Sequence, residues 1–266
     1  MLAAALAGCG GGAATVSPPT ERAVIVAATT SLEDTGLMPA LVERFHAETP
    51  WRLKTLSVPS GEALGLIQRG SADVAVTNAP VEEHEALETG KACCRTLVMQ
   101  NDFVIVGPPG TPAFKGGLSP LAAMRLIVDR DLLFISRGDE SGTNEFELGL
   151  WDEAGLKPAG DRYLESGQGM GATLRIASEK AALTISDRGT YAAEREHLDL
   201  EIVYASPEEM PAPYSMLRAT DKAGRRINAE GAEAFARWLM DPETQRFIGS
   251  FEVGGQQLFE PAVAER

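Results

Sequence analysis

Hydrophobic and polar positions follow two different periods along the chain after residue 22. Short apolar runs rich in β-branched residues predict buried strands, whereas apolar residues three or four positions apart predict amphipathic helices. The predicted strands are Ala23–Thr30, Trp51–Val58, Ala72–Thr77, Asn101–Gly107, Leu132–Ser136, Ala182–Ser186, Glu201–Ala205 and Tyr214–Arg218. The predicted helices are Leu37–Glu48, Glu62–Arg69, Pro120–Asp129, Thr143–Ala154, Met170–Lys180, Arg188–Arg195, Ala229–Met240 and Pro242–Gly249. This alternation predicts an α/β fold with mostly parallel sheets.

Two proline-rich breaks, Pro108–Pro112 and Pro207–Pro213, divide these elements into two series. We expect the chain to cross between two lobes at these breaks. The first lobe would then be discontinuous and combine residues 23–107 with residues 208–266, and the second lobe would hold residues 108–207.

The first 22 residues have a different character. Residues 6–9 read Leu-Ala-Gly-Cys, which resembles the bacterial lipobox, and a Gly-, Ser- and Pro-containing stretch follows. Only eight residues precede Cys9, and an apolar leader with a chance cysteine is the alternative. We expect residues 1–22 to be a lipoprotein signal remnant and a flexible tether, with Cys9 as the lipidated residue.

The charge balance excludes one class of partner. The 266 residues carry a formal net charge of −14, with 38 acidic side chains against 24 basic ones, whereas nucleic-acid binding needs clustered cations.

Outside the leader the only cysteines are Cys93 and Cys94, which are adjacent and cannot form an ordinary disulfide bridge. We expect two small, partly buried thiols at the start of a strand.

Four polar, glycine-rich segments lie where predicted strands end and helices begin, which is where open α/β sheets bind ligands. The segments are residues 29–31, 60–61, 136–143 and 166–171. Helix N-termini, hydroxyl groups and close-approaching glycine backbone together make an anion-binding site, and Arg137 adds a positive charge. The alternatives are that the Ser and Thr side chains only cap helices, and that Arg137 pairs with Asp139 or Glu140.

Residues for catalysis are lacking from these segments. His46, His84 and His197 all lie elsewhere, so a Ser–His–Asp arrangement has no base. The phosphate-loop motif and Cys/His zinc clusters are absent from the sequence. We therefore expect a binding protein rather than an enzyme, with no cofactor and no metal site.

Several of these segments resemble the tungstate-binding proteins of bacterial ABC importers. The similar stretches are TTS with LMPALVERFHAE, NDFVIVGP, SRGDESGTNEFELGLWDEAGLKP, SGQGMGATL, TISDRGTY and IGSFEVGGQQLF. The resemblance extends from about residue 23 to 262 and implies a type II-like periplasmic-binding-protein fold, with the anion in a cleft between two α/β lobes. It also implies a membrane permease as partner and a location in the periplasm or at the cell surface. We expect a monomer.

The resemblance also implies which residues bind the anion. These are Thr30, Ser31, Ser60, Arg137, Ser141, Gly142 and Thr143, with Met170 and Gly171 contributing backbone N–H groups. The chain departs from its relatives at Asn78 and Asn144, where histidine is common.

Whether the anion carries a proton at neutral pH bears on which anion the site prefers. At neutral pH, tungstate, molybdate and sulfate can accept hydrogen bonds but cannot donate them. Hydrogen phosphate can also donate one, so a site for it benefits from a carboxylate acceptor. Asp139 is the candidate acceptor, and we interpret it first as a partner of Arg137 or a helix cap. Tungstate, with molybdate as a further ligand, is therefore expected, with an affinity nearly flat between about pH 7 and 9 because no histidine lies in the site. A phosphate or sulfate binder, a two-lobed transferase and a sensory module remain alternatives.

Overall fold

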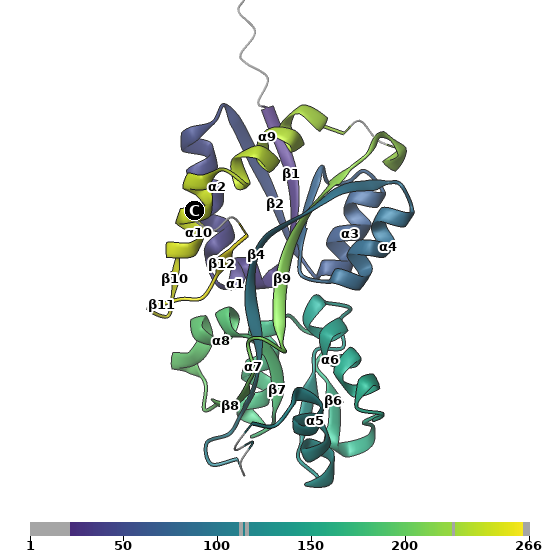
Figure 1. Ribbon diagram of the computed structural model, residues 1–266, viewed down its shortest axis with the longest axis vertical. Coiled ribbons are helices and arrows are strands. Elements are labelled where there is room, and N and C mark those ends of the chain that lie inside the picture. Colours follow the sequence, from purple (N-terminus) through teal and green to yellow (C-terminus); the bar gives the residue numbers. More distant parts are fainter. Residues whose placement is uncertain (1–21, 112–113, 115–116, 225–226, 263–266) are drawn as a thin grey trace, which may run out of the picture.

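The computed structural model describes residues 22–111, 114, 117–224 and 227–262. The chain forms two lobes, one above the other in Figure 1, and two long strands, β4 and β9, run from one lobe into the other. These strands are β4 (Ala92–Gly107) and β9 (Pro211–Ala219). Most of residues 1–22, including Cys9, lie outside the described residues, so lipidation stays a prediction.

The first lobe contains the N-terminal elements and the C-terminal helices. Its strands and helices are β1 (Arg22–Thr29), α1 (Thr30–Asp34), α2 (Leu37–Glu48), β2 (Trp51–Val58), α3 (Ser60–Gln68), β3 (Val74–Thr77), α4 (Pro80–Glu88), a 3₁₀ turn (Asp221–Ala223), α9 (Ala229–Leu239), α10 (Pro242–Ser250), β10 (Glu252–Val253), β11 (Gln256–Gln257) and β12 (Glu260–Pro261). Helices α2, α9 and α10 lie on one side of this lobe and α3 and α4 on the other (Figure 1).

The second lobe is built from the middle of the chain. Its elements are α5 (Pro120–Asp129), β5 (Phe134–Ser136), α6 (Gly142–Glu153), a 3₁₀ turn (Gly160–Arg162), β6 (Tyr163–Glu165), α7 (Met170–Glu179), β7 (Thr184–Asp187), α8 (Arg188–Glu194), a 3₁₀ turn (Arg195–His197) and β8 (Glu201–Ala205). The α/β fold and its two lobes agree with the sequence-based expectation.

The expectation of mostly parallel sheets was wrong. Strands β2 and β3 pair parallel to β1, and β6 pairs parallel to β5. In contrast, β9 lies antiparallel between β3 and β4, and β7 and β8 both pair antiparallel with β4. The sheet is mixed because the two strands that link the lobes run in opposite directions.

Strand β4 changes partners in the middle of its length. Residues from Ala92 to Asp102 pair with β9, whereas residues from Phe103 to Gly107 pair with β7 and β8. The five residues from Phe103 to Gly107, expected in the first lobe, thus hydrogen-bond to strands of the second. The lobe boundaries drawn from the proline-rich breaks stay a prediction, and the pairing indicates a crossover between Asp102 and Phe103.

A buried apolar cluster extends through both lobes and fixes the helices on the sheet. In the first lobe, Phe45 of α2 and Phe235 of α9 meet edge to face, with ring centroids 5.4 Å apart. In the second, Phe134 of β5 and Trp151 of α6 do the same at 5.4 Å. In each lobe an aromatic pair thus holds a helix against a neighbouring helix or strand.

Some local structure differs from the expectation. Thr30, expected at the end of a strand, begins helix α1, and α4 was not predicted, whereas the strand expected to start at Cys93 and Cys94 is the first half of β4. Cys94 is exposed rather than partly buried, because β4 bulges between Cys93 and Thr96 and Cys94 takes a left-handed backbone, with φ of 62°.

Candidate functional site

Helix N-termini from both lobes meet at the lobe interface. Helix α1 follows β1 in the first lobe and packs against α7 and α8 of the second. The N-cap residues of α1 and α7, Thr29 and Gly169, make no side-chain cap bond. The N-cap side chains therefore leave the first N–H groups of these helices unoccupied, and the positive partial charge of the helix ends favours an anion.

Arg137 lies beside these helix ends, one residue after β5. Its side chain is 2 % exposed, and Nη2 donates to Oδ2 of Asp139 at 2.6 Å. Its backbone is fixed too, because the Gly167 N–H donates to the Arg137 carbonyl at 2.8 Å. Nε of Arg137 is buried and finds no acceptor among the described residues. A buried guanidinium donor without an acceptor is an opening for a ligand oxygen.

Asp139 has the role that the sequence suggested first. One carboxylate oxygen accepts from Arg137, and Oδ1 accepts the backbone N–H of Ser141 at 3.3 Å. Asp139 thus orients Arg137 and supports the start of α6 at once.

The first lobe contributes hydroxyl groups at the same place. The Ser31 hydroxyl and the Tyr214 hydroxyl are 3.1 Å apart and either can donate. Tyr214 is fully buried, and burial raises the pKa of its hydroxyl well above the usual value, with the neighbouring Asp187 adding to the shift. The buried Thr30 hydroxyl has no partner within the described part of the chain. Tyr214, a donor at every physiological pH, was not predicted.

Two carboxyl groups that the sequence reading missed also lie here. The pKa of Asp34 is raised to about 6, mainly by burial and then by the charge of Asp187, while Arg137 and the Gly171 backbone N–H partly offset the rise. Burial likewise raises the pKa of Asp187, while hydrogen bonds from Thr190 and the charge of Arg137 lower it. We call Ser31, Asp34, Arg137, Asp187 and Tyr214 the Arg137 side of the interface.

The predicted residues on α7 belong to this side as well. Met170 and Gly171 are its first two residues, and both are buried. The Gly171 N–H acts on Asp34 of the other lobe, as its effect on the pKa of Asp34 shows. The N-terminus of α7 therefore already faces a carboxyl group across the interface.

Ser60, at the start of α3, is paired with Asn78 of its own lobe. Its hydroxyl donates to Oδ1 of Asn78 at 2.9 Å and accepts the Asn78 N–H at 3.3 Å. Gly142 of the second lobe lies against the same residue, because a Cβ built on Gly142 would be 2.2 Å from the Asn78 carbonyl oxygen. Asn78 thus joins Ser60 to the backbone of the other lobe.

The start of α6 is held by its own side chains. Ser141 is the N-cap, and its hydroxyl accepts the Asn144 N–H at 3.2 Å, while Thr143 is buried. Ser141 therefore caps α6, and its role as an anion ligand stays a prediction. Further along, Oε1 of Glu145 accepts the Val81 N–H at 3.1 Å, so Glu145 caps α4 of the first lobe. We call Ser60, Asn78, Gly142 and Glu145 the Asn78 side.

Acidic residues gather at the edge of the Asn78 side. The pKa of Glu82 is raised to about 7, mainly by burial and then by the charges of Glu145 and Glu140 across the interface. Oε2 of Glu82 is buried with no donor among the described residues.

A buried carboxyl group supports the strand that leads to Arg137. Glu147 accepts hydrogen bonds from Ser136 at 2.6 Å, from Tyr163 at 2.8 Å and from Trp151 at 2.9 Å. Asn144 in turn donates to the Ser136 hydroxyl at 3.2 Å. Burial raises the pKa of Glu147, and its hydrogen bonds lower it. These bonds fix the residue that precedes Arg137.

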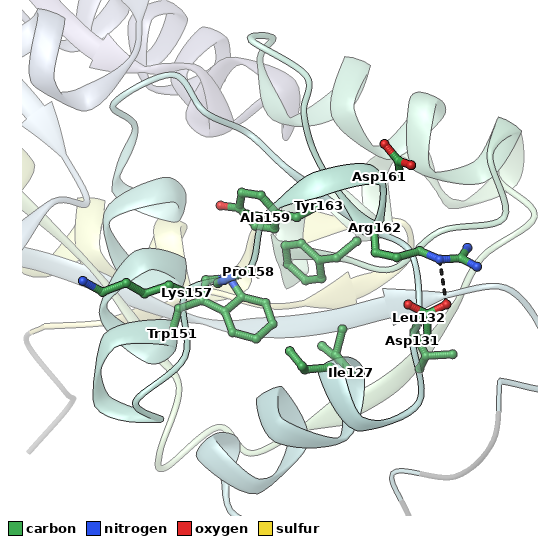
Figure 2. A pocket seen from close by; sticks show the side chains of 12 residues that line it. Ile127, Asp131, Leu132, Trp151, Lys157, Pro158, Ala159, Asp161, Arg162 and Tyr163 are labelled. Carbon is green, nitrogen blue, oxygen red and sulfur yellow. Dashed lines mark hydrogen bonds and ion pairs between the residues drawn. The ribbon is translucent and has the colours of Figure 1, made fainter.

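A separate pocket of about 290 Å³ lies in the second lobe (Figure 2). The rings of Trp151 and Tyr163 and the side chain of Ile127 line it, and Arg162 on its rim is paired with Asp131 at 2.9 Å. Tyr163 is its only hydroxyl-bearing residue. Its cations are Lys157 and Arg162, of which Arg162 is paired with Asp131, and it lacks the buried hydroxyl groups found beside Arg137.

Comparison with known proteins assigns the family. Residues 14–243 match the PBP superfamily domain. The chain is 38% identical over 277 residues to the tungstate-binding protein TupA of Peptoclostridium acidaminophilum, an alignment that covers 100% of this chain and 96% of the relative. The chain belongs to the TupA family.

Solved structures of the TupA family have the same fold. TupA from Desulfovibrio alaskensis G20 is 32% identical, with a TM-score of 0.76 over 91% of this chain and 99% of the other. A tungstate ABC transporter structure from Geobacter sulfurreducens is 33% identical, with a TM-score of 0.78 over 86% of this chain and 98% of the other. The predicted resemblance and the periplasmic-binding-protein fold are both confirmed. Within the described residues, no helix is long and apolar enough to cross a membrane.

Proposed function

We propose that the protein is the solute-binding component of an ABC importer and captures tungstate, with molybdate as a further ligand, between its two lobes. The observation that carries this proposal is Arg137, a buried guanidinium whose Nε has no acceptor in the described structure. It lies beside two helix N-termini without side-chain caps. A tetrahedral oxyanion supplies the acceptors that this arrangement lacks.

Membership of the TupA family supports the partner and the location in this proposal, and the Leu-Ala-Gly-Cys run supports the role of Cys9. We propose a permease in the membrane as the partner and the periplasm or the cell surface as the location, with Cys9 as the lipid attachment point and a monomer as the soluble form. We also propose that the protein has no enzymatic activity, because its histidines lie away from the Arg137 side. A turnover assay across phosphate esters tests this last point.

A second ligand has one observation in its favour. Asp34 and Asp187 on the Arg137 side can each accept a hydrogen bond from a protonated oxygen, as hydrogen phosphate presents. A phosphate binder of the same fold is therefore the alternative function.

The test is a calorimetric titration with tungstate, molybdate, sulfate and phosphate. We expect tungstate and molybdate to bind tightly and phosphate weakly. Sulfate has shorter bonds and leaves some donors unpaired, each at about 1–3 kcal/mol, so it should bind at least roughly a hundredfold more weakly. Phosphate binding as tightly as tungstate would overturn the assignment.

A further inference from the structure

Asp187 has a buried oxygen atom that the protein leaves without a partner. It is the last residue of β7 and the N-cap of α8, and its side chain has no solvent exposure. Oδ1 accepts the Thr190 N–H at 2.8 Å, but Oδ2 has no donor within the described residues. An ionised carboxylate in this position carries a large desolvation cost.

The elements packed around Asp187 offer little compensating positive charge. Asp34 from α1, Arg137 after β5 and the Tyr214 hydroxyl from β9 all act on it or respond to it electrostatically. From β4, the amide nitrogen of Asn101 lies close to Gly189, the second residue of α8, and has no partner in the described structure.

The other nearby arginines are already paired. Arg188 of α8 donates two hydrogen bonds to Asp102, at 2.7 and 2.6 Å. Arg175 of α7 is paired with Glu194 of α8. Arg137 is therefore the cation that acts on Asp187, and Asp139 already balances its charge at 2.6 Å.

The charges on this side do not suit a dianion when every carboxyl group is ionised. Arg137 and Asp139 cancel, and ionised Asp34 and Asp187 would add two negative charges beside the incoming anion. Neighbouring like charges repel strongly in a buried site, where the dielectric constant is low. The protein can remove this conflict by placing a proton on a carboxyl group, which then becomes a hydrogen-bond donor.

We propose that Asp187 holds a proton in the anion-bound protein and donates it in a hydrogen bond to the captured oxyanion, so that capture of a dianion takes up a proton from solvent. This inference rests on the proposed function. Asp187 already has the properties that such a donor needs, namely complete burial, a free oxygen and a fixed orientation. It is thereby a specificity-determining residue of the site.

The proton balance separates the two ligand classes. Tungstate arrives without a proton, so the protein must acquire one, and its affinity falls as pH rises by up to about tenfold per pH unit for each proton taken up. Hydrogen phosphate brings its own proton, which an ionised Asp187 accepts, and no net uptake occurs. The expectation that tungstate affinity stays nearly flat between about pH 7 and 9 considered histidine alone. With Asp34 and Asp187 in the site, we expect the affinity to fall as pH rises instead.

The experiment is calorimetry with tungstate at several pH values between about 6 and 9, in buffers that differ in ionisation enthalpy, which counts protons. We expect net uptake that grows with pH in the wild-type protein. In Asp187→Asn, the amide can donate to the anion without a proton and can still cap Thr190. This variant should lose the Asp187 share of the uptake and bind tungstate at least about tenfold more tightly than wild type at the highest pH.

The matched control is Asp129→Asn, which removes the same charge from an exposed position at the end of α5 and should keep the wild-type proton count. Tungstate binding by the wild-type protein with no proton uptake would overturn the inference but leave the proposed function standing. So would an Asp187→Asn protein that melts like wild type and keeps the full uptake or binds no tungstate. Absence of tungstate binding by the wild-type protein in every buffer would instead refute the proposed function.

Discussion

The two sides of the lobe interface differ in which buried polar atoms have partners, although Glu82 at the edge of the Asn78 side also has a buried oxygen without a donor among the described residues. On the Asn78 side, Ser60, Asn78 and Glu145 all have partners, and Gly142 brings the backbones into direct contact. On the Arg137 side, Arg137 Nε and Asp187 Oδ2 are buried without partners in the described structure. In Figure 1, α3, α4 and α6 lie on one flank of the molecule and α8 on the other.

This difference assigns different tasks to residues that look alike in the sequence. Hydroxyl groups before helices occur on both sides, but a satisfied hydroxyl group fixes the contact between lobes whereas an unsatisfied donor awaits a ligand. We therefore interpret the Asn78 side as the contact that sets lobe closure and the Arg137 side as the anion site.

Arg137→Ala should give the largest effect. It removes the cation from the Arg137 side and leaves the anion without a charge-assisted partner, which should cost about 2–5 kcal/mol of tungstate binding free energy. Calorimetry measures this loss. Arg162→Ala, which removes a side chain on the rim of the separate pocket, should bind as wild type. An affinity in Arg137→Ala close to that of wild type would place the anion elsewhere.

Gly142→Ala should weaken binding indirectly. The added methyl group would be 2.2 Å from the Asn78 carbonyl oxygen, so the lobes must separate on that side. We expect a loss of roughly 1–3 kcal/mol in tungstate binding and a larger radius of gyration with saturating ligand, measured by small-angle scattering.

The control for that variant lies on the same helix. A Cβ on Gly149 of α6 meets nothing within 4 Å, so Gly149→Ala should leave binding and closure unchanged. Wild-type protein should also contract when tungstate is added. Identical scattering with and without ligand would argue against closure by a hinge.

Ser60→Ala tests whether Ser60 binds the anion or only Asn78. Because its hydroxyl already pairs with Asn78, we expect a loss of about 1 kcal/mol in the free energy of unfolding and less than about a tenfold change in tungstate affinity. Thermal melting and calorimetry measure the two quantities. A loss of affinity as large as that of Arg137→Ala would make Ser60 a direct ligand, as the family resemblance implied.

The pH dependence of stability should show the smallest effect. A carboxyl group whose pKa is raised in the folded protein contributes stability that is complete below its unfolded pKa and lost as pH rises through the folded pKa. For Glu82 this window runs from the ordinary value of 4.5 to about 7, and for Asp34 from 3.8 to about 6. The ligand-free protein should therefore melt at a higher temperature near pH 5.5 than near pH 7.5.

Glu82→Gln should reduce this difference in melting temperature between the two pH values. Glu62→Gln, at an exposed position on α3, should retain the wild-type difference. Equal pH profiles of melting temperature for wild type and both variants would show that the pKa of Glu82 is not raised in the folded protein.

The sequence predicted the two lobes and Arg137 as an anion ligand. It did not predict that one side of the interface would join the lobes and the other would bind the anion. Strand and helix periodicity is local, so both lobes followed from it, whereas the antiparallel insertion of β4 and β9 depends on pairing between distant segments. Asp187 was within reach, because it sits at a strand–helix junction like the predicted segments. Its importance became visible only when burial placed it near Arg137 and Asp34. The hydrogen bond from Ser60 to Asn78 is a tertiary contact, and the local sequence around either residue does not indicate it.

The central claim is that the anion binds on the Arg137 side. Anomalous diffraction at a tungsten absorption edge, from crystals grown with tungstate, locates the metal directly. We predict one strong peak with ligand oxygens within hydrogen-bond distance of Arg137 Nε and Asp187 Oδ2, at the N-termini of α1 and α7. A peak on the Asn78 side or in the pocket of Figure 2, with no density beside Arg137, would contradict the account.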